Sequence, residues 1–337
     1  IDFHEVYAAV AKPMSFKIFV AIAARFGWVL HHFDVVGAFL NATVKELIYI
    51  DLPEGSQQPG KCGQLLKTLY GLKQSPREWL QLLTSVLRSL GFQPINADQS
   101  VFTFATESPD SDFKNLKILV YVDDLLVLAP TIEMTTKFGN LLAKQFEITD
   151  NGKCTHFLGI DLHYMDSGSI QLSQKGYIQK TLDRFGMTDS KPVATPFNAK
   201  EKLLPYDDMA SPDDVKLYQE MIGSLIWLMV STRPDIAYTV SKLASYSSNP
   251  SPEHLTAVKR VFRYLAGSQR LGLTYSATSA TSATSEDDGK LIGYCDADWA
   301  GPHAEKSKST SGYLFKLANG PISWSSKRQK SVALSST

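Results

Sequence analysis

In the first half of the chain, some segments space their apolar residues as in a helix and others as in a strand. Residues 16–26 place Ile, Phe, Val and Ala at helical spacing, whereas residues 28–33 form a short apolar run that ends at Asp34. Ser75 and Pro76 match a capping residue and a first-turn proline, which predicts a helix from this point. This helix is predicted to end at Gly91. The pattern then predicts strands over 101–105, 118–122 and 125–129, a helix over 131–146, and strands over 156–164 and 169–172.

The second half of the chain predicts a helical region followed by a small group of strands. Four prolines between residues 192 and 212 indicate a loop, and Ser251 precedes Pro252 as a further helix cap. Residues 276–285 repeat Ser-Ala-Thr, a polar composition that predicts a flexible linker. The elements predicted here are helices over 215–230, 235–247 and 252–266 and strands over 291–295, 312–317 and 322–324. Because hairpins replace alternating βαβ units, the whole pattern predicts an α+β fold.

Composition is typical of an intracellular globular protein. The chain has 337 residues, of which 44% are hydrophobic and 20% charged, enough to bury a large core. Its three cysteines are far apart and odd in number, which fits neither a disulfide framework nor a zinc site and indicates a reducing compartment. The apolar run 221–230 is far shorter than the roughly 20 residues of a membrane span, so we expect no membrane partner. The chain opens without methionine, as expected for a piece of something longer.

The overall charge gives no support for nucleic-acid binding. The 34 basic and 34 acidic residues cancel, whereas a basic excess is typical of proteins that neutralise phosphates. Local basic clusters occur over 259–263, 306–308 and 327–330, and each alone is better interpreted as a solvated face. Any nucleic-acid function must therefore be argued from motifs.

The most informative segment is 118–128, in which two apolar runs flank Asp123 and Asp124. One interpretation is a plain β-hairpin with these two residues as its turn, but such turns favour a glycine because a central residue takes positive φ. The other interpretation is a metal site. Two carboxylates about 4 Å apart repel by on the order of 4 kcal/mol at an effective dielectric of about 20. A divalent cation turns this repulsion into ligation, and hard oxygen ligands suit Mg²⁺.

Asp34 is the candidate for a further carboxylate. Two-metal chemistry needs another acidic group to bridge ions about 3.5–4 Å apart. Asp34 ends a predicted strand and begins the segment Asp-Val-Val-Gly-Ala-Phe-Leu at 34–40. Taken alone, an aspartate at such a place is more often a turn residue or a helix cap. The metal interpretation therefore predicts that Asp34, Asp123 and Asp124 meet in the fold.

Six segments together resemble the reverse transcriptase region of copia-type retrotransposon polyproteins. Tyr-Val-Asp-Asp at 121–124 resembles the Tyr-x-Asp-Asp box of reverse transcriptases, and residues 34–40 resemble their first catalytic box. The other four are Leu-Tyr-Gly-Leu-Lys-Gln-Ser-Pro-Arg at 69–77, Phe-Leu-Gly-Ile at 157–160, Thr-Arg-Pro-Asp-Ile-Ala at 232–237 and Asp-Ala-Asp-Trp-Ala-Gly at 296–301. The resemblance covers essentially the whole chain, with the boxes in the family's order.

The resemblance implies a right-hand polymerase followed by the start of an RNase H-like domain. The implied division is an N-terminally truncated fingers and palm at 1–164, a helical thumb or connection at 165–275, a low-complexity linker at 276–290 and a partial RNase H-like domain at 291–337. The family's basic fingers segment precedes the position of Ile1, so its triphosphate contacts are expected to be missing. A Glu-Ala-Glu segment follows the position of Thr337, so Asp296 would be a remnant and no RNase H activity is expected.

The resemblance also implies roles for individual residues. Asp34 and Asp123 would bind two Mg²⁺ ions, for which Mn²⁺ can substitute, and Asp124 would support them. The backbone of Val35 would contribute its carbonyl to a metal and its amide to phosphates. The remaining implied residues are Phe39, Gly71 and Lys73 at the nucleotide, Phe157, Leu158 and Gly159 at the primer grip, and Lys153 as an acid for the leaving group. For Phe39 a core position, and for Lys153 an exposed loop, are the alternative interpretations.

The implied function is RNA-directed DNA synthesis. Such a polymerase would add dNTPs to a primer 3′-hydroxyl on an RNA template, working with other polyprotein segments in a cytoplasmic virus-like particle or in the nucleus. One alternative is an inactive remnant that acts at most as a nucleic-acid-binding module, and another is a purely structural segment. A departure from the family pattern is Ala42 in place of glycine, which predicts about 1 kcal/mol of backbone strain.

Overall fold

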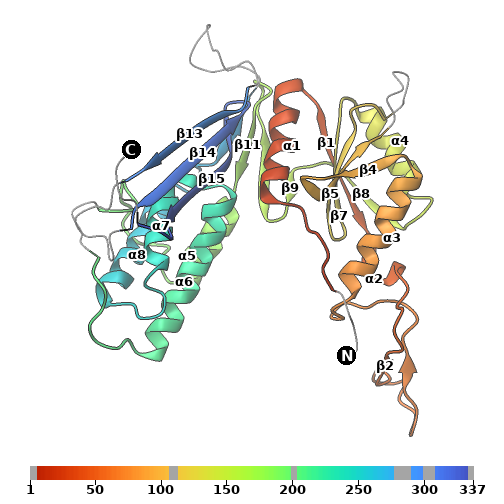
Figure 1. Ribbon diagram of the computed structural model, residues 1–337, viewed down its shortest axis with the longest axis horizontal. Helices are drawn as coiled ribbons and strands as arrows, with labels where there is room; N and C mark the ends of the chain where they lie inside the picture. Colours follow the sequence, from red (N-terminus) through yellow and green to blue (C-terminus); the bar gives the residue numbers. More distant parts are fainter. Residues whose placement is uncertain (1–5, 106–112, 199–202, 277–289, 299–307, 333–337) are drawn as a thin grey trace. The chain divides into compact units, whose positions relative to one another are not determined.

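The computed structural model describes residues 6–105, 113–198, 203–276, 290–298 and 308–332. The chain divides into two compact units, residues 1–154 and 155–337, and Figure 1 shows helices and strands in both. This mixed content confirms the coarse α+β prediction. Within the described ranges, no helix combines the length and apolar character needed to cross a bilayer.

The first unit is built on a six-stranded antiparallel sheet. Its strands, in spatial order, are β4 (Phe92–Ile95), β5 (Asp98–Phe104), β6 (Lys117–Tyr121), β7 (Asp124–Ala129), β1 (Val29–Val35) and β8 (Ile148–Lys153). Strand β1 thus lies between β7 and β8, although both come much later in the chain. This order places the strand that carries Asp34 beside the strand that begins at Asp124.

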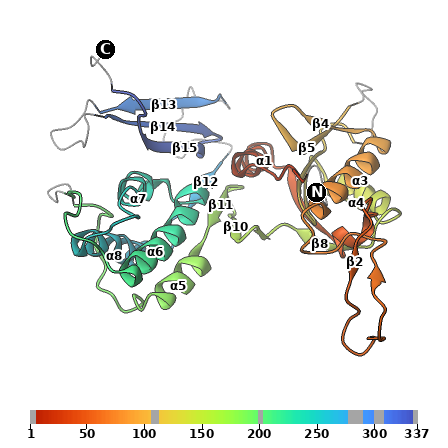
Figure 2. The ribbon, with the colours of Figure 1, turned by 60° about the horizontal axis from the view of Figure 1, so that its bottom comes forward.

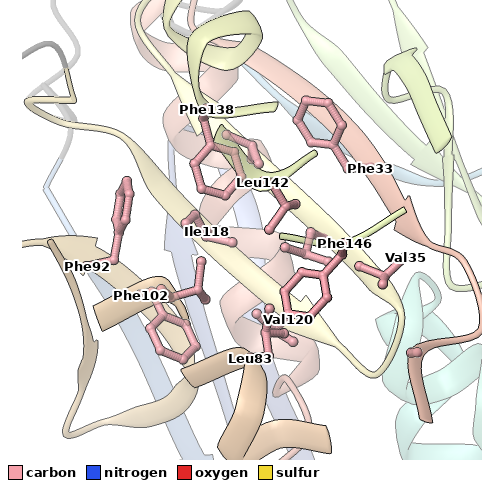
Figure 3. Packing of buried hydrophobic residues seen from close by; sticks show 14 of the residues in the cluster. Phe33, Val35, Leu83, Phe92, Phe102, Ile118, Val120, Phe138, Leu142 and Phe146 are labelled. Carbon is pink, nitrogen blue, oxygen red and sulfur yellow. The ribbon is translucent and has the colours of Figure 1, made fainter. Parts of the chain in front are cut away.

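One face of this sheet packs against helices α3 (Ser75–Ser89) and α4 (Ile132–Leu142). Side chains alternate between the two faces of a strand, so Phe33 and Val35 of β1 point into this core whereas Asp34 points to the opposite face. Figure 3 shows buried members of the cluster: Phe33, Val35, Leu83, Phe92, Phe102, Ile118, Val120, Phe138, Leu142 and Phe146. The core therefore fixes which side of the sheet presents the carboxylate.

The remaining elements of the first unit flank this sheet. Helix α1 (Pro13–Phe26) contacts β1 and ends at Gly27, whose left-handed backbone (φ 66°) lets its N–H donate to the carbonyl of Ala23. The short helix α2 (Ala38–Asn41) follows β1 almost directly. Strands β2 (Tyr49–Ile50) and β3 (Gly63–Gln64) pair as a separate small ladder.

The second unit combines a four-stranded sheet with a helical cluster. The strands are, in spatial order, β12 (Leu273–Tyr275), β11 (Ile170–Ser173), β10 (Ile160–Tyr164) and β9 (His156–Phe157). The helices are α5 (Lys175–Arg184), α6 (Pro212–Ser231), the 3-10 turn η1 (Pro234–Ile236), α7 (Ala237–Ala244) and α8 (Pro252–Gly267). They share one apolar core, in which Leu182, Leu225, Val240 and Phe262 are buried.

A third sheet belongs to the same unit and is tied to its helices and strands. It consists of β13 (Ile292–Ala297), β14 (Thr310–Leu317) and β15 (Gly320–Arg328), and Figure 2 shows it lying over α7. The indole N–H of Trp324 donates to the carbonyl of Met229 over 2.8 Å. The hydroxyl of Tyr275 donates to the carbonyl of Pro321 over 2.6 Å. The predicted division at 165, 276 and 291 stays a prediction.

The two predicted helix caps have different outcomes. Ser251 caps α8 as predicted, because its hydroxyl accepts the N–H of His254 while the imidazole of His254 accepts the N–H of Ser251. The predicted cap at Ser75 is wrong. Helix α3 already includes this residue, Gln74 stands at the cap position, and the hydroxyl of Ser75 donates to the carbonyl of Leu69 instead.

Other local predictions need correction. Helix α5 was not predicted, because its buried face presents little more than Ile178 and Leu182 among polar residues. The strand predicted over 156–164 is interrupted by a tight turn at Leu158 (φ 49°) and Gly159 (φ 76°). The predicted strain at Ala42 is absent, since this residue is extended at φ −82°. The predicted linker at 276–285 lies, apart from its first residue, outside the described residues.

Candidate nucleotidyl-transfer site

The hairpin between β6 and β7 is closed by a turn one residue earlier than the sequence suggests. Tyr121 pairs with Asp124, so the two central residues are Val122 and Asp123, and Asp124 is already part of β7. Val122 takes φ 59°, a left-handed conformation that is unfavourable for a β-branched side chain. The prediction that Asp123 and Asp124 form the turn is therefore wrong, and the strained position belongs to Val122.

Two hydrogen bonds from outside the hairpin hold this turn. The indole N–H of the buried Trp79, on α3, donates to the carbonyl of Val122 over 2.7 Å. The backbone N–H of Val35 donates to the carbonyl of Asp123 over 2.9 Å. The amide of Val35 is thus engaged in the sheet, so the predicted contact between this amide and a phosphate is not available. Strain in a backbone persists where surrounding contacts overdetermine it, and these two bonds do so here.

Asp34 and Asp124 lie directly opposite each other on β1 and β7. The bond from Val35 to Asp123 shows that the next pair along is a hydrogen-bonded one, so Asp34 and Asp124 form a non-hydrogen-bonded pair. In that class the Cα atoms are about 4.5 Å apart and the side chains lie closest. The register therefore brings together the two carboxylates that the sequence placed far apart, with Asp123 adjacent on the turn.

The electrostatics of Asp34 reflect this convergence. Burial contributes most to raising the pKa of Asp34 above its ordinary value, and the charges of Asp123 and Asp124 raise it further. The neighbouring His32 acts in the opposite direction. The charged form of Asp34 is therefore disfavoured in the protein alone, and a cation placed among the three carboxylates would favour it.

Two polar neighbours of the carboxylates escaped the sequence analysis. His32 Nε2 lies 2.7 Å from Asp124 Oδ1, and the hydroxyl of Tyr70 donates to Asp123 Oδ2 over 3.4 Å. His32 precedes Asp34 by two residues, so strand alternation puts both on one face and was a usable signal. Tyr70 lies in a different part of the chain, and only the packing of that segment against the hairpin shows the contact.

The predicted nucleotide residues surround this hairpin in different ways. Phe39, on α2, is 8% exposed and belongs to the hydrophobic core, while the ring of Tyr70 lies against it with centroids 4.5 Å apart. Gly71 takes φ 101°, which favours glycine, in the turn over 69–72, and Lys73 lies in the following turn, which leads into α3. The core position that sequence analysis left open for Phe39 is thus the observed one, whereas the nucleotide contacts stay a prediction.

The chemistry of the donors fits divalent cations. Carboxylate oxygens are the ligands that Mg²⁺ prefers, and three carboxylates converge without an Arg or Lys among the charges that shift the pKa of Asp34. Across the described ranges, no group of three Asp, Glu, His or Cys side chains is already drawn together as a metal cage. One oxygen of Asp124 is bonded to His32 instead. The carboxylates would therefore have to close around ions as these bind.

The other predicted site residues lie elsewhere in the fold. Phe157 is buried and Leu158 and Gly159 form the β9–β10 turn in the second unit. Lys153 ends β8 in the first unit. Asp296 is exposed on β13, where its carboxylate accepts the N–H of Ala297. Their proposed contacts with primer, leaving group or metal stay predictions.

Comparisons with known proteins agree with the geometry. The family described as reverse transcriptase (RNA-dependent DNA polymerase) matches residues 1–199. The whole chain is 36% identical to part of the retrovirus-related Pol polyprotein from transposon TNT 1-94 of Nicotiana tabacum and 36% identical to that from transposon RE1 of Arabidopsis thaliana, and spans 25% and 22% of their lengths. The transposon Ty5-1 protein YCL074W of Saccharomyces cerevisiae is 34% identical over 89% of the chain and 93% of its own length.

A solved structure supports the same fold. The foamy viral protease-reverse transcriptase in complex with an RNA/DNA hybrid aligns with 96% of the chain and 36% of its own, at a TM-score of 0.51 and 13% sequence identity. At this identity the likeness concerns the fold alone. Reverse transcriptases as a family generally use divalent metal ions.

Proposed function

Because the chain belongs to the reverse transcriptase family of copia-type retrotransposon Pol polyproteins, we propose that it carries out RNA-directed DNA synthesis at Asp34, Asp123 and Asp124. The observation that carries the proposal is the direct cross-strand pairing of Asp34 with Asp124 beside the locked turn at Asp123. Two Mg²⁺ ions, when bound, would activate the primer 3′-oxygen and stabilise the charge that develops on the α-phosphate.

The protein's own residues have separate tasks in this proposal. Asp34 and Asp123 would hold both ions, and the carbonyl of Val35 would add a backbone ligand. Asp124 would support the pair, and its Oδ1 is hydrogen-bonded to His32 Nε2 over 2.7 Å. Trp79 and the amide of Val35 hold the turn that aims Asp123. Positioning and charge stabilisation of this kind supply most of the catalysis in phosphoryl transfer.

The proposed substrates follow from the same chemistry. They are dNTPs, a DNA primer and an RNA template, with Gly71 and Lys73 near the nucleotide and the β9–β10 turn at Leu158 and Gly159 as the primer grip. In this assignment residues 1–164 are fingers and palm, residues 165–275 are thumb and connection, and β13–β15 belong to the partial RNase H-like domain at 291–337. We place the reaction in a cytoplasmic virus-like particle, together with other segments of the polyprotein.

Primer extension tests the proposal directly. The chain is incubated with poly(rA)–oligo(dT), dTTP and Mg²⁺ or Mn²⁺, and product length is measured on a gel. We expect metal-dependent extension that Asp123→Asn abolishes. Matched binding measurements with the same primer–template complete the test. Binding without extension, at any metal concentration, would contradict the polymerase and leave a nucleic-acid-binding module.

A further inference from the structure

His32 lies on the same face of β1 as Asp34, beside the carboxylates. In the register of β1 with β7, Asp34 lies opposite Asp124 and His32 lies opposite Leu126, so His32 and Asp124 are diagonal neighbours. Diagonal neighbours in a sheet are about 7–8 Å apart, a span that a long or aromatic side chain can bridge. The imidazole does so, with Nε2 2.7 Å from Asp124 Oδ1. The strand that carries Asp34 thus also carries the partner of Asp124.

A β-bulge in β8 supplies a second partner for this imidazole. A single residue of β1, His32, separates two positions that pair with β8, whereas Asn151 and Gly152 together separate their partners. An extra residue of this kind re-aims the side chains around it. The amide nitrogen Nδ2 of Asn151 lies 3.4 Å from His32 Nδ1. Each ring nitrogen of His32 therefore has a partner, one on each neighbouring strand.

The bulge is held by further bonds, which give Asn151 a defined place. Gly152 takes φ 69°, a left-handed conformation that glycine adopts readily, and its N–H donates to Asp150 Oδ1 over 2.8 Å. The same carboxylate oxygen lies 2.5 Å from Nε2 of His31, which is buried and points to the opposite face of β1. Two consecutive histidines of β1 thus contact two consecutive residues of β8.

Asn151 determines which tautomer of His32 fits these contacts. An amide NH₂ group only donates, so the Nδ1 atom that it meets must accept and carries no proton. In the neutral imidazole the proton then lies on Nε2, from which it can be donated to the carboxylate of Asp124. In the other tautomer a lone pair of Nε2 would face the carboxylate and repel it. The contacts therefore select the form of His32 that holds Asp124.

The bond from His32 limits how the carboxylate of Asp124 can turn. The side chains of His32 and Asp124 are 16% and 28% exposed, so water competes only in part for the bond between them. A donor bonded to one of several converging carboxylates also favours its charged form. A ligand that is already oriented loses less conformational freedom when an ion binds. His32 thus supplies what a flexible aspartate at this place would lack.

We propose that His32 is a positioning residue that orients the carboxylate of Asp124 toward the metal ions, and that Asn151 fixes the tautomer of His32 for this task. The inference rests on the proposed polymerase function, because the ions are those of that reaction. His32 contacts neither the ions nor the nucleotide in this assignment. Partners of metal ligands typically contribute about 10- to 100-fold to metal affinity or activity, which sets the size of the expected effect.

Four variants separate orientation from a merely structural role. His32→Phe keeps a ring and removes both nitrogens, whereas His32→Gln keeps a donor at the place of Nε2. Asn151→Ala leaves the imidazole intact and removes its partner on β8. His163→Leu is the matched control, since Nε2 of His163, on β10 in the second unit, lies 3.1 Å from the hydroxyl of Ser173. Thermal unfolding of each variant establishes that it is folded.

The first test measures Mn²⁺ binding in the absence of nucleotide and primer. Free Mn²⁺ is followed by electron paramagnetic resonance, and only the binding that Asp34→Asn removes is compared. We expect His32→Phe to weaken this binding by about 10-fold or more and Asn151→Ala by less, while His32→Gln and His163→Leu stay within about threefold of wild type. The proposal is overturned if wild type binds no Mn²⁺, if His32→Phe binds it as wild type does, or if His32→Gln is as weak as His32→Phe.

A spectroscopic test needs neither metal nor activity. Nitrogen-15 NMR of histidine-labelled protein reports which ring nitrogen carries the proton, and the signal of His32 is the one missing in His32→Gln. Above the titration range of the ring we expect a protonated Nε2 and a bare Nδ1 in wild type, and a mixture of tautomers in Asn151→Ala. A wild-type ring protonated at Nδ1 would contradict the proposal, whether or not the chain extends primers.

Primer extension on poly(rA)–oligo(dT) keeps this inference distinct from the polymerase function. We expect His32→Phe to lower kcat by about 10- to 100-fold and to leave KM for dTTP within about threefold, because the ring orients a metal ligand and does not contact the nucleotide. Full extension by His32→Phe overturns the positioning role and leaves the polymerase intact. A wild-type chain that binds Mn²⁺ but never extends a primer overturns the polymerase, and the binding and NMR results then still decide the role of His32.

Discussion

Aspartates at two places in this molecule have opposite electrostatic surroundings. In the first unit, Asp34 lies opposite Asp124 and beside Asp123, and its pKa is raised by burial and by those two charges. In the second unit, burial pushes the pKa of Asp235 upward, but the hydrogen bonds and charge of Arg233 outweigh it and the pKa is lowered. In the first group burial and like charges outweigh the effect of His32, whereas the second group contains a buried arginine as its counter-ion.

The partners of Asp235 show what compensation looks like. Arg233 is 1% exposed and donates to both oxygens of Asp235, from Nε over 3.0 Å and from Nη2 over 2.7 Å. The same guanidinium donates to the carbonyl of Ser268, and the hydroxyl of Tyr264 donates to Asp235. This cluster links η1 to the end of α8, and each of its two charges has a partner of opposite charge within it. In the first unit burial and the charges of Asp123 and Asp124 raise the pKa of Asp34, and a divalent cation bound among these carboxylates would offset their repulsion.

The largest expected effect is a loss of activity without a loss of stability. Asp34→Asn should reduce primer extension by about a thousandfold, because one charged group that stabilises the transition state is lost. The free energy of unfolding should stay equal or rise, since a repelled charge is removed. Gel-based extension and urea unfolding measure the two quantities, with Asp235→Asn as the opposite control that loses stability. A marked loss of stability in Asp34→Asn would contradict the net repulsion assigned to the charged form of Asp34.

Removing the built-in counter-ion should have the next largest effect. Arg233→Met leaves Asp235 partly buried without its cation, and breaking such a pair costs about 3 kcal/mol. Urea unfolding monitored by tryptophan fluorescence gives the value. The double variant Arg233→Met, Asp235→Leu should recover part of the loss, because neither charge is then left alone. A double variant as unstable as Arg233→Met would show that lost packing, not charge, is responsible.

Divalent ions should stabilise the folded chain through the carboxylates of the first unit and not through Asp235. Binding to the folded state alone adds about 2.7 kcal/mol when Mg²⁺ stands at 100 times its Kd. We expect the melting temperature of the wild-type chain and of Asp235→Asn to rise with Mg²⁺. Asp34→Asn should show a much smaller rise. An equal rise in all three proteins would mean that the ions bind elsewhere.

The smallest expected effect is the pH dependence without divalent ions. The pKa of Asp34 is raised above its ordinary value of 3.8, so the folded state binds the proton more tightly and stability falls as pH rises from about that value through the raised pKa. The pKa of Asp235 is lowered from 3.8, so its contribution is present above that value and is lost as pH falls through the lowered pKa. Urea unfolding between pH 3 and pH 6 should show the stability difference between wild type and Asp34→Asn growing with pH.

This difference should amount to less than about 1 kcal/mol, because solvent screens a partly exposed carboxylate. Asp235→Asn provides the contrast, since its deficit relative to wild type should shrink toward acid pH. A pH-independent difference for Asp34→Asn would contradict the raised pKa.

Local patterns predicted most of the elements, and the failures have a common cause. The apolar runs around Asp123 and the cap at Ser251 depend on residues within a few positions, and both were recognisable. Helix α5 has only a narrow apolar face, and this face is buried in the tertiary structure, where α5 packs against α8. The turn at Val122 was misplaced because valine in a left-handed conformation is intrinsically unfavourable, and only Trp79 and Val35 make it tolerable.

The sequence by itself determined that two apolar strands and a tight turn carry Asp123 and Asp124, and that another strand ends near Asp34. These features follow from the two-residue period of a strand and from local turn chemistry. Only the tertiary structure decided that Asp34 faces Asp124, that His32 and Tyr70 are their partners, and that Phe39 is covered. The register between β1 and β7, and the packing of distant segments, are set by the whole core at once, so no local pattern contains them.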